Sequence, residues 1–142
     1  PGWSIDPEQA HVAHFDDVAT LKLFGKPIPR SSATARMTFI GPGGLGLLRI
    51  RVPDMGEILV LETHTPTEPM RIRLELRWFA EPRIPRLLVS YVVGNWVSQL
   101  LGDILIWERK SYVARPMVVE NDGPVHRLRH WYRQFYEPVH TA

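Results

Sequence analysis

The feature that most constrains the fold is a change of sequence pattern near residue 80. Before it, short segments alternate apolar and polar residues and are separated by turns that contain glycine or proline, which is typical of antiparallel strands. After Pro85 the chain continues to Lys110 without a turn signal. Proline suits the first turn of a helix, and Arg109 and Lys110 suit the last turn. The sequence therefore predicts one long helix over residues 85–110.

The strands before this helix are predicted from their alternation. In residues 71–79 the charged side chains fall on one face of a strand and the large apolar ones on the other. Short turns between successive strands predict a meander. We expect the first ten residues to be an irregular lead-in and residues 25–32 to be a loop, because the latter contain two prolines. The predicted strands are residues 18–24, 33–40, 45–52, 57–65 and 71–79.

Together these elements predict an α+β fold with a curved antiparallel sheet and a long C-terminal helix packed across it, the arrangement called helix-grip or START-like. The length predicts a single domain over residues 1–142. Within it, 1–84 would form the sheet, 85–110 the long helix, and 111–142 a connector and a second helix over 123–137. Such a fold leaves a cavity between helix and sheet.

Composition narrows the possible functions. The chain has no cysteine, which excludes disulfides, iron–sulfur ligation and thiolate zinc sites within it. The net charge is only +2, which argues against a dedicated nucleic-acid binder. No signal peptide is visible and the chain does not begin with methionine, so we expect a piece of a longer protein. Its compartment stays open between the cytoplasm and association with a membrane.

Three polar side chains stand four residues apart in the apolar segment: Asn95, Gln99 and Asp103. On a helix this spacing places them on one face, with Trp96 and Trp107 beside them. A plain solvent face remains an alternative. A membrane span is another, although each polar group would then need a partner in hydrocarbon. A narrow polar stripe on an apolar helix also suits a cavity or a ligand, so we expect Asp103 to face a site rather than bulk solvent.

A composite motif occupies residues 102–136. It consists of Asp-x-x-Ile-Trp with a basic residue soon after, a proline, Asp-Gly-Pro, and Arg-x-Trp-Tyr-x-Gln-Phe-Tyr. Its residues are Asp103, Ile106, Trp107, Lys110, Pro116, Asp122, Gly123, Pro124, Arg129, Trp131, Tyr132, Gln134, Phe135 and Tyr136. The motif resembles the C-terminal end of Rieske-type steroid oxygenases, which include the cholesterol 7-desaturases of the Neverland type and the 3-ketosteroid 9α-hydroxylases. His130 departs from the pattern, since the family often has a second arginine there.

The resemblance implies a function and its cofactors. Family members bind mononuclear non-heme Fe(II) through two histidines and one carboxylate, a set that leaves positions open for O2, and the carboxylate would be Asp103. They also carry a [2Fe–2S] Rieske domain, which a chain without cysteine cannot supply. The implied reaction is O2- and NAD(P)H-dependent oxidation or desaturation of a sterol or steroid, with electrons from a reductase and a homo-trimeric assembly. Asn95 and Gln99 would line the cavity or support the metal ligands, while Trp96 and Trp107 would form its walls.

The iron histidines are not evident in the sequence. His11 and His14 are the nearest candidates, but they lack the family's spacing and would point to opposite faces of a strand. Two interpretations therefore remain. The chain is the C-terminal part of an oxygenase and inactive alone, or it is a free-standing helix-grip protein that binds a sterol or another apolar ligand without redox chemistry and without a cofactor.

Overall fold

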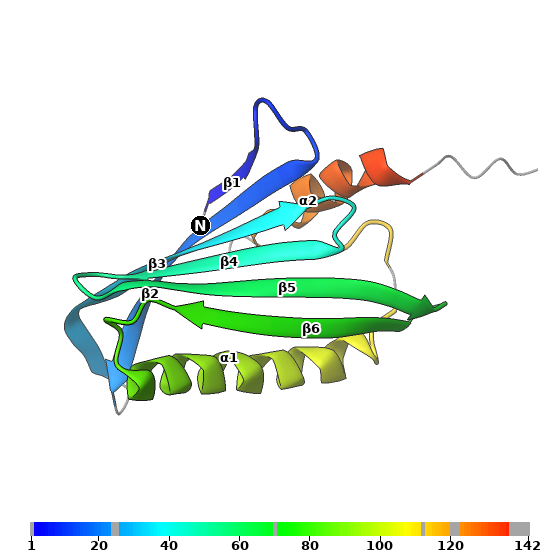
Figure 1. Ribbon diagram of the computed structural model, residues 1–142. Helices are drawn as coiled ribbons and strands as arrows, with labels where there is room; N and C mark the ends of the chain where they lie inside the picture. Colours follow the sequence, from blue (N-terminus) through cyan, green and yellow to red (C-terminus); the bar gives the residue numbers. More distant parts are fainter. Residues whose placement is uncertain (1, 24–25, 70, 112, 120–122, 137–142) are drawn as a thin grey trace, which may run out of the picture.

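A six-stranded sheet forms the body of the molecule in this computed structural model, which describes residues 2–23, 26–69, 71–111, 113–119 and 123–136 (Figure 1). The strand order follows the sequence from β1 to β6. Every neighbouring pair is antiparallel, so the predicted meander is confirmed. The strands are β1 (Gly2–Ile5), β2 (Val12–Leu23), β3 (Lys26–Ile40), β4 (Leu45–Val52), β5 (Gly56–Glu68) and β6 (Arg71–Ala80).

The long helix lies in the middle of the chain. This helix, α1, spans Arg86–Trp107 and runs beside β6, roughly along the strands (Figure 1). It is long and apolar enough to cross a membrane by length and composition, yet here it lies along a sheet. A second helix, α2 (Val125–Tyr132), follows, and a single 3-10 turn, η1 (Arg133–Phe135), continues it.

The fold-class prediction of a long C-terminal helix is therefore wrong. The 22-residue helix ends at Trp107, and the connector with α2 and η1 comes after it. The apolar pattern of residues 86–107 predicts a long helix but does not determine its place among the other elements of the fold. The short helix α2 packs against the start of the sheet, because its Trp131 is buried against Trp3 of β1.

Several strand boundaries also differ from the prediction, and β2 begins at Val12 rather than at residue 18. Residues 2–5 form β1 rather than an irregular lead-in, because they pair with Ala13–Asp16 of β2. The expected loop at 25–32 belongs largely to β3, which begins at Lys26. Pairing of β3 with β4 starts only at Thr34, so the segment with the prolines is an edge on that side. An edge tolerates proline because no ladder hydrogen bond is lost there.

The register gives the sheet two distinct faces. The face toward α1, here called the inner face, carries alternate residues of each strand, and on β5 these include the fully buried Ile58 and Val60. Trp78 of β6 meets Trp96 of α1 edge to face at 6.2 Å between ring centroids. This contact ties the helix to the inner face and places the apolar core between them.

The helix α2 closes the inner face near β1. Trp131 is 2% exposed, and its indole Nε1 donates a hydrogen bond to the Ala10 carbonyl at 2.8 Å. Its ring packs edge to face on Trp3, Tyr132 and Phe135 at 6.1, 5.0 and 5.0 Å between centroids. We call this cluster the aromatic clasp, and it connects the last described helix to the first two strands.

Gly41→Ala is expected to destabilise the clasp. A Cβ atom at position 41 would clash with the ring of Phe135, and overpacking of this kind costs about 1–3 kcal/mol. Urea unfolding measures the loss. Gly44→Ala is the matched control, because a Cβ there meets only the His64 carbonyl oxygen, at 3.7 Å. Equal stability of the two variants would contradict the expectation.

Candidate functional site: a cavity between helix and sheet

A cavity of about 660 Å³ lies between α1 and the inner face. This volume lies within the range of about 300–1,000 Å³ that is usual for small-molecule sites. The sheet side is mostly apolar, because alternate residues of β2, β3 and β4 point there. The apolar residues that line it from the sheet are Phe15, Ala33, Ala35, Met37, Leu48, Ile50 and Val52.

The helix side of the cavity combines apolar residues with the predicted polar stripe. Asn95, Gln99 and Asp103 all line it, together with Trp96 and Trp107. The three polar residues are themselves exposed, so the cavity is open to solvent along this side of α1. The Asn95 side-chain amide donates a hydrogen bond to the Tyr91 carbonyl at 3.0 Å, while Trp107 is 45% exposed. The structure thus brings all the helix residues singled out in the sequence to one cavity, and their roles there stay a prediction.

Glu62 borders the same cavity from the sheet, and the sequence analysis missed it. It is only 4% exposed, and its Oε1 atom has no hydrogen-bond partner among the described residues. Burial raises the pKa of the Glu62 carboxyl. The alternation of β5 could have revealed it, since residue 62 shares a face with Ile58 and Val60.

Glu62→Gln is expected to raise the melting temperature at neutral pH. In the folded state, the pKa of this carboxyl lies above its ordinary value of 4.5. The protein therefore has its full stability below about pH 4.5, and it loses stability as the pH rises from there through the folded-state pKa. Glutamine has no proton to lose, so the variant should gain about 3 °C for each kcal/mol recovered. Near pH 4 the gain should vanish.

Calorimetry at several pH values checks this expectation. Asp17 and Asp103 line the same cavity, and His64 follows Glu62 on the inner face of β5. These three residues are the same in the variant and in the parent, so the difference between the two proteins isolates Glu62. A difference in melting temperature that does not change with pH would contradict the prediction.

The two candidate histidines lie away from Asp103. His14 points to the opposite, outer face, where its Nδ1 lies 3.0 Å from the Thr38 hydroxyl and its Nε2 lies 3.8 Å from Asp6. His11 is exposed in the turn before β2. Within the described ranges, no group of three His, Cys, Asp or Glu side chains could hold a metal ion. No histidine is among the described residues that line the cavity with Asp103, and the described residues do not by themselves complete an iron site.

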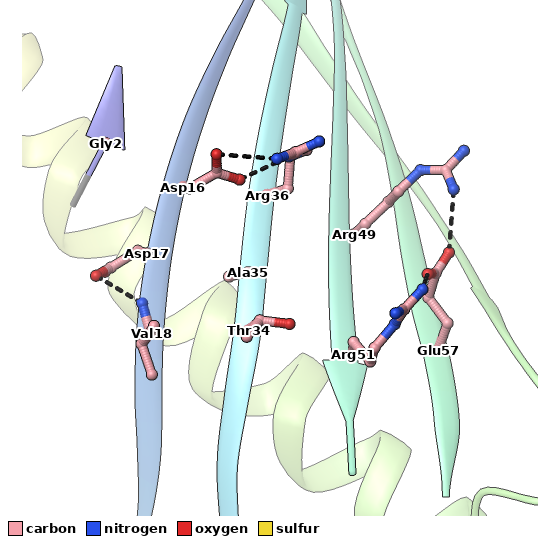
Figure 2. A pocket seen from close by; sticks show the side chains of 10 residues that line it. All are labelled: Gly2, Asp16, Asp17, Val18, Thr34, Ala35, Arg36, Arg49, Arg51 and Glu57. Carbon is pink, nitrogen blue, oxygen red and sulfur yellow. Dashed lines mark hydrogen bonds and ion pairs between the residues drawn. The ribbon is translucent and has the colours of Figure 1, made fainter. Parts of the chain in front are cut away.

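A second, charged depression lies on the outer face, and Figure 2 shows the residues that line it. Its volume is about 820 Å³. Arg36 donates two hydrogen bonds to Asp16, at 2.6 and 3.1 Å, and these lower the pKa of Asp16. Arg49 and Arg51 both approach Glu57, at 3.4 and 3.8 Å. The charges are largely paired with one another, and such exposed pairs contribute little free energy. The inner cavity is therefore the better candidate site, although the outer one is larger.

Known proteins match this chain over most of its length. A family model described as the 3-ketosteroid 9alpha-hydroxylase C-terminal domain matches residues 28–136. A cholesterol 7-desaturase nvd from Xenopus laevis is 27% identical over 139 residues, which is 94% of this chain and 30% of that protein. A cholesterol 7-desaturase from Caenorhabditis elegans is 30% identical over 137 residues, which is 94% of this chain and 31% of that protein.

A bacterial relative is named after a different reaction from that of the two desaturases. A probable 3-ketosteroid-9-alpha-monooxygenase, oxygenase component, from Rhodococcus rhodochrous is 32% identical over 88 residues, which is 58% of this chain and 22% of that protein. The chain spans less than a third of the length of these curated relatives. No solved structure matches it, so the expected helix-grip or START-like likeness is not confirmed.

Proposed function

Because the chain belongs to the 3-ketosteroid 9alpha-hydroxylase C-terminal domain family, we propose that it is the C-terminal catalytic-domain portion of a Rieske-type non-heme iron oxygenase or desaturase that acts on a sterol or steroid. The observation that carries the proposal is the cavity between α1 and the sheet. Its apolar sheet side suits a steroid ring system, and its helix side carries the carboxylate of the family motif.

Asp103 is proposed as the iron carboxylate of the intact enzyme. No described histidine lines the cavity with it, so the two histidines would come from outside the described residues, and the [2Fe–2S] cluster from outside a chain that has no cysteine. When bound, the iron would supply O2 activation. The chain alone, without those histidines, would be inactive, and the electrons would come from NAD(P)H through a reductase to a trimeric enzyme.

The other cavity residues would bind and orient the substrate. The apolar side chains of β2, β3 and β4 would take up the ring system and exclude water from it. Trp96 and Trp107 would form the wall on the helix side, and Asn95 and Gln99 would line the cavity or orient the groups around Asp103. The position of each side chain along the cavity supports this division of roles.

Ligand binding to the full chain tests the proposal, with cholesterol and cholest-4-en-3-one as probes and tryptophan fluorescence as the signal. We expect saturable binding of at least one probe. Ala35→Phe should weaken it at least tenfold, because the ring fills part of the cavity. Thr34→Phe is the matched control, since its side chain lies on the outer face of the same strand.

Iron content separates the two interpretations of the chain. An oxygenase portion should show Asp103-dependent iron when it is part of the intact enzyme, whereas a free-standing sterol-binding protein would bind the probes and stay without iron in every form. Absence of binding by both probes would overturn the proposed function in either version.

A further inference from the structure

Glu62 is the single buried charged residue among those the structure describes, at 4% exposure. It stands in the middle of β5, two residues beyond the fully buried Val60 and directly opposite Gly46 of β4. A Cβ atom at position 46 would lie 2.8 Å from the terminal methyl of Met37 and 3.4 Å from Oε2 of Glu62. The glycine therefore leaves the space that the carboxyl occupies.

Nothing in the described part of the chain satisfies this carboxyl. Oε1 has no hydrogen-bond partner there, and none of the ion pairs among described residues includes Glu62. Buried polar groups normally have a partner, and an unpaired one costs folding free energy. A carboxyl left in this state at the border of a cavity indicates that its partner arrives with the ligand.

The surroundings define what that ligand offers. The sheet side of the cavity around Glu62 is largely apolar, with Met37 and Leu48 among its lining residues, whereas Gln99 and Asp103 line the helix side. A ligand that fills the apolar part can meet Glu62 only with a small polar group. In an apolar environment the neutral form of a carboxyl is favoured, and it offers one O–H donor and an acceptor oxygen.

We propose that Glu62 is the specificity-determining group of the cavity, and that its carboxyl hydrogen-bonds the hydroxyl or keto oxygen of an otherwise apolar steroid-like ligand. The inference rests on the proposed function, because it assumes that such a ligand occupies the cavity. The hydrogen bond satisfies the buried carboxyl and orients the ring system relative to the polar stripe of α1.

Two ligands, one with this oxygen and one without it, test the inference on the full chain. Cholesterol and 5α-cholestane share the saturated part of the ring skeleton and the side chain, and cholestane lacks the hydroxyl. We expect cholesterol to bind about 10-fold to 100-fold more tightly, because without the hydroxyl the carboxyl stays unpaired. Glu62→Met should bring the affinity for cholesterol down to that for cholestane and leave the latter unchanged.

Two further variants complete the test. Glu62→Gln keeps a donor and an acceptor and should keep the preference for cholesterol. Glu57→Met makes the same change as Glu62→Met on the outer face of β5, visible in Figure 2, and should bind like the parent. Equal affinity of the parent for both ligands, or an unchanged preference in Glu62→Met, would overturn the inference while leaving the proposed function intact. Failure of the parent to bind either ligand would overturn both.

Discussion

Replacing Trp131 by alanine is expected to lower the free energy of unfolding by about 3–5 kcal/mol, the range for removing a buried tryptophan. The side chain is 2% exposed and touches aromatic rings of β1, α2 and η1. Its loss leaves a cavity in the aromatic clasp and removes the hydrogen bond from the indole to the Ala10 carbonyl. A large share of the total stability of a domain this size would be lost.

Chemical denaturation measures the effect, and two variants calibrate it. Trp131→Phe keeps one ring and loses the indole donor and part of the ring volume, so it should cost less than the alanine variant. The Ala10 carbonyl keeps a hydrogen bond from the Gln134 side-chain amide at 3.0 Å, so the lost donor should cost only about 0.5–1.5 kcal/mol. Trp107→Ala removes an indole that is 45% exposed and should cost much less. If Trp131→Ala and Trp107→Ala unfold at the same urea concentration, the aromatic clasp does not stabilise the contact between α2 and the sheet.

The substitution Asp103→Asn is expected to remove activity from an intact oxygenase that carries this chain. An amide binds Fe(II) more weakly than a carboxylate, and even partners that only support a metal ligand cost 10–100-fold when mutated. We expect sterol turnover to fall at least a hundredfold and the iron content of the purified enzyme to fall with it. The sterol affinity of the iron-free protein should change little, since Asp103 meets the cavity at its exposed helix side.

Glu108→Gln is the matched control for the iron experiment. It makes the same chemical change five residues further along, at the exposed end of α1 and outside the cavity. Full iron content in Asp103→Asn would show that this carboxylate is not an iron ligand, whatever happens to turnover. Loss of iron in both variants would point to damage to the helix instead.

The sequence predicted best those elements whose pattern is local. The alternation of residues 45–52 marks β4 at both ends, Leu45 and Val52, and the absence of turn signals after Pro85 marks α1. The strand β1 was not predicted because its four residues form a strand by pairing with β2. That pairing is not visible in the sequence of so short a segment. The prolines of β3 suggested a loop because the sequence does not show that the segment is an edge.

The helix side of the candidate site was predictable from the sequence, whereas the sheet side was not. The spacing of Asn95, Gln99 and Asp103 defines one face of a helix, and that face does meet a cavity. Glu62 was overlooked because a glutamate in a strand is usually exposed, and its burial depends on the helix that covers it. Which residues face each other across the cavity depends on how α1 lies on the sheet, and no local pattern encodes that.

The aromatic clasp also has a consequence for the order in which the molecule assembles and comes apart. Each strand pairs with its sequence neighbour, so each hairpin closes only a short loop at a small entropic cost. The bond from Trp131 to Ala10, by contrast, joins residues 121 positions apart. The last helix is therefore expected to dock late and to detach early, and a proteolytic cut in the connector after α1 would release it while the sheet stays paired.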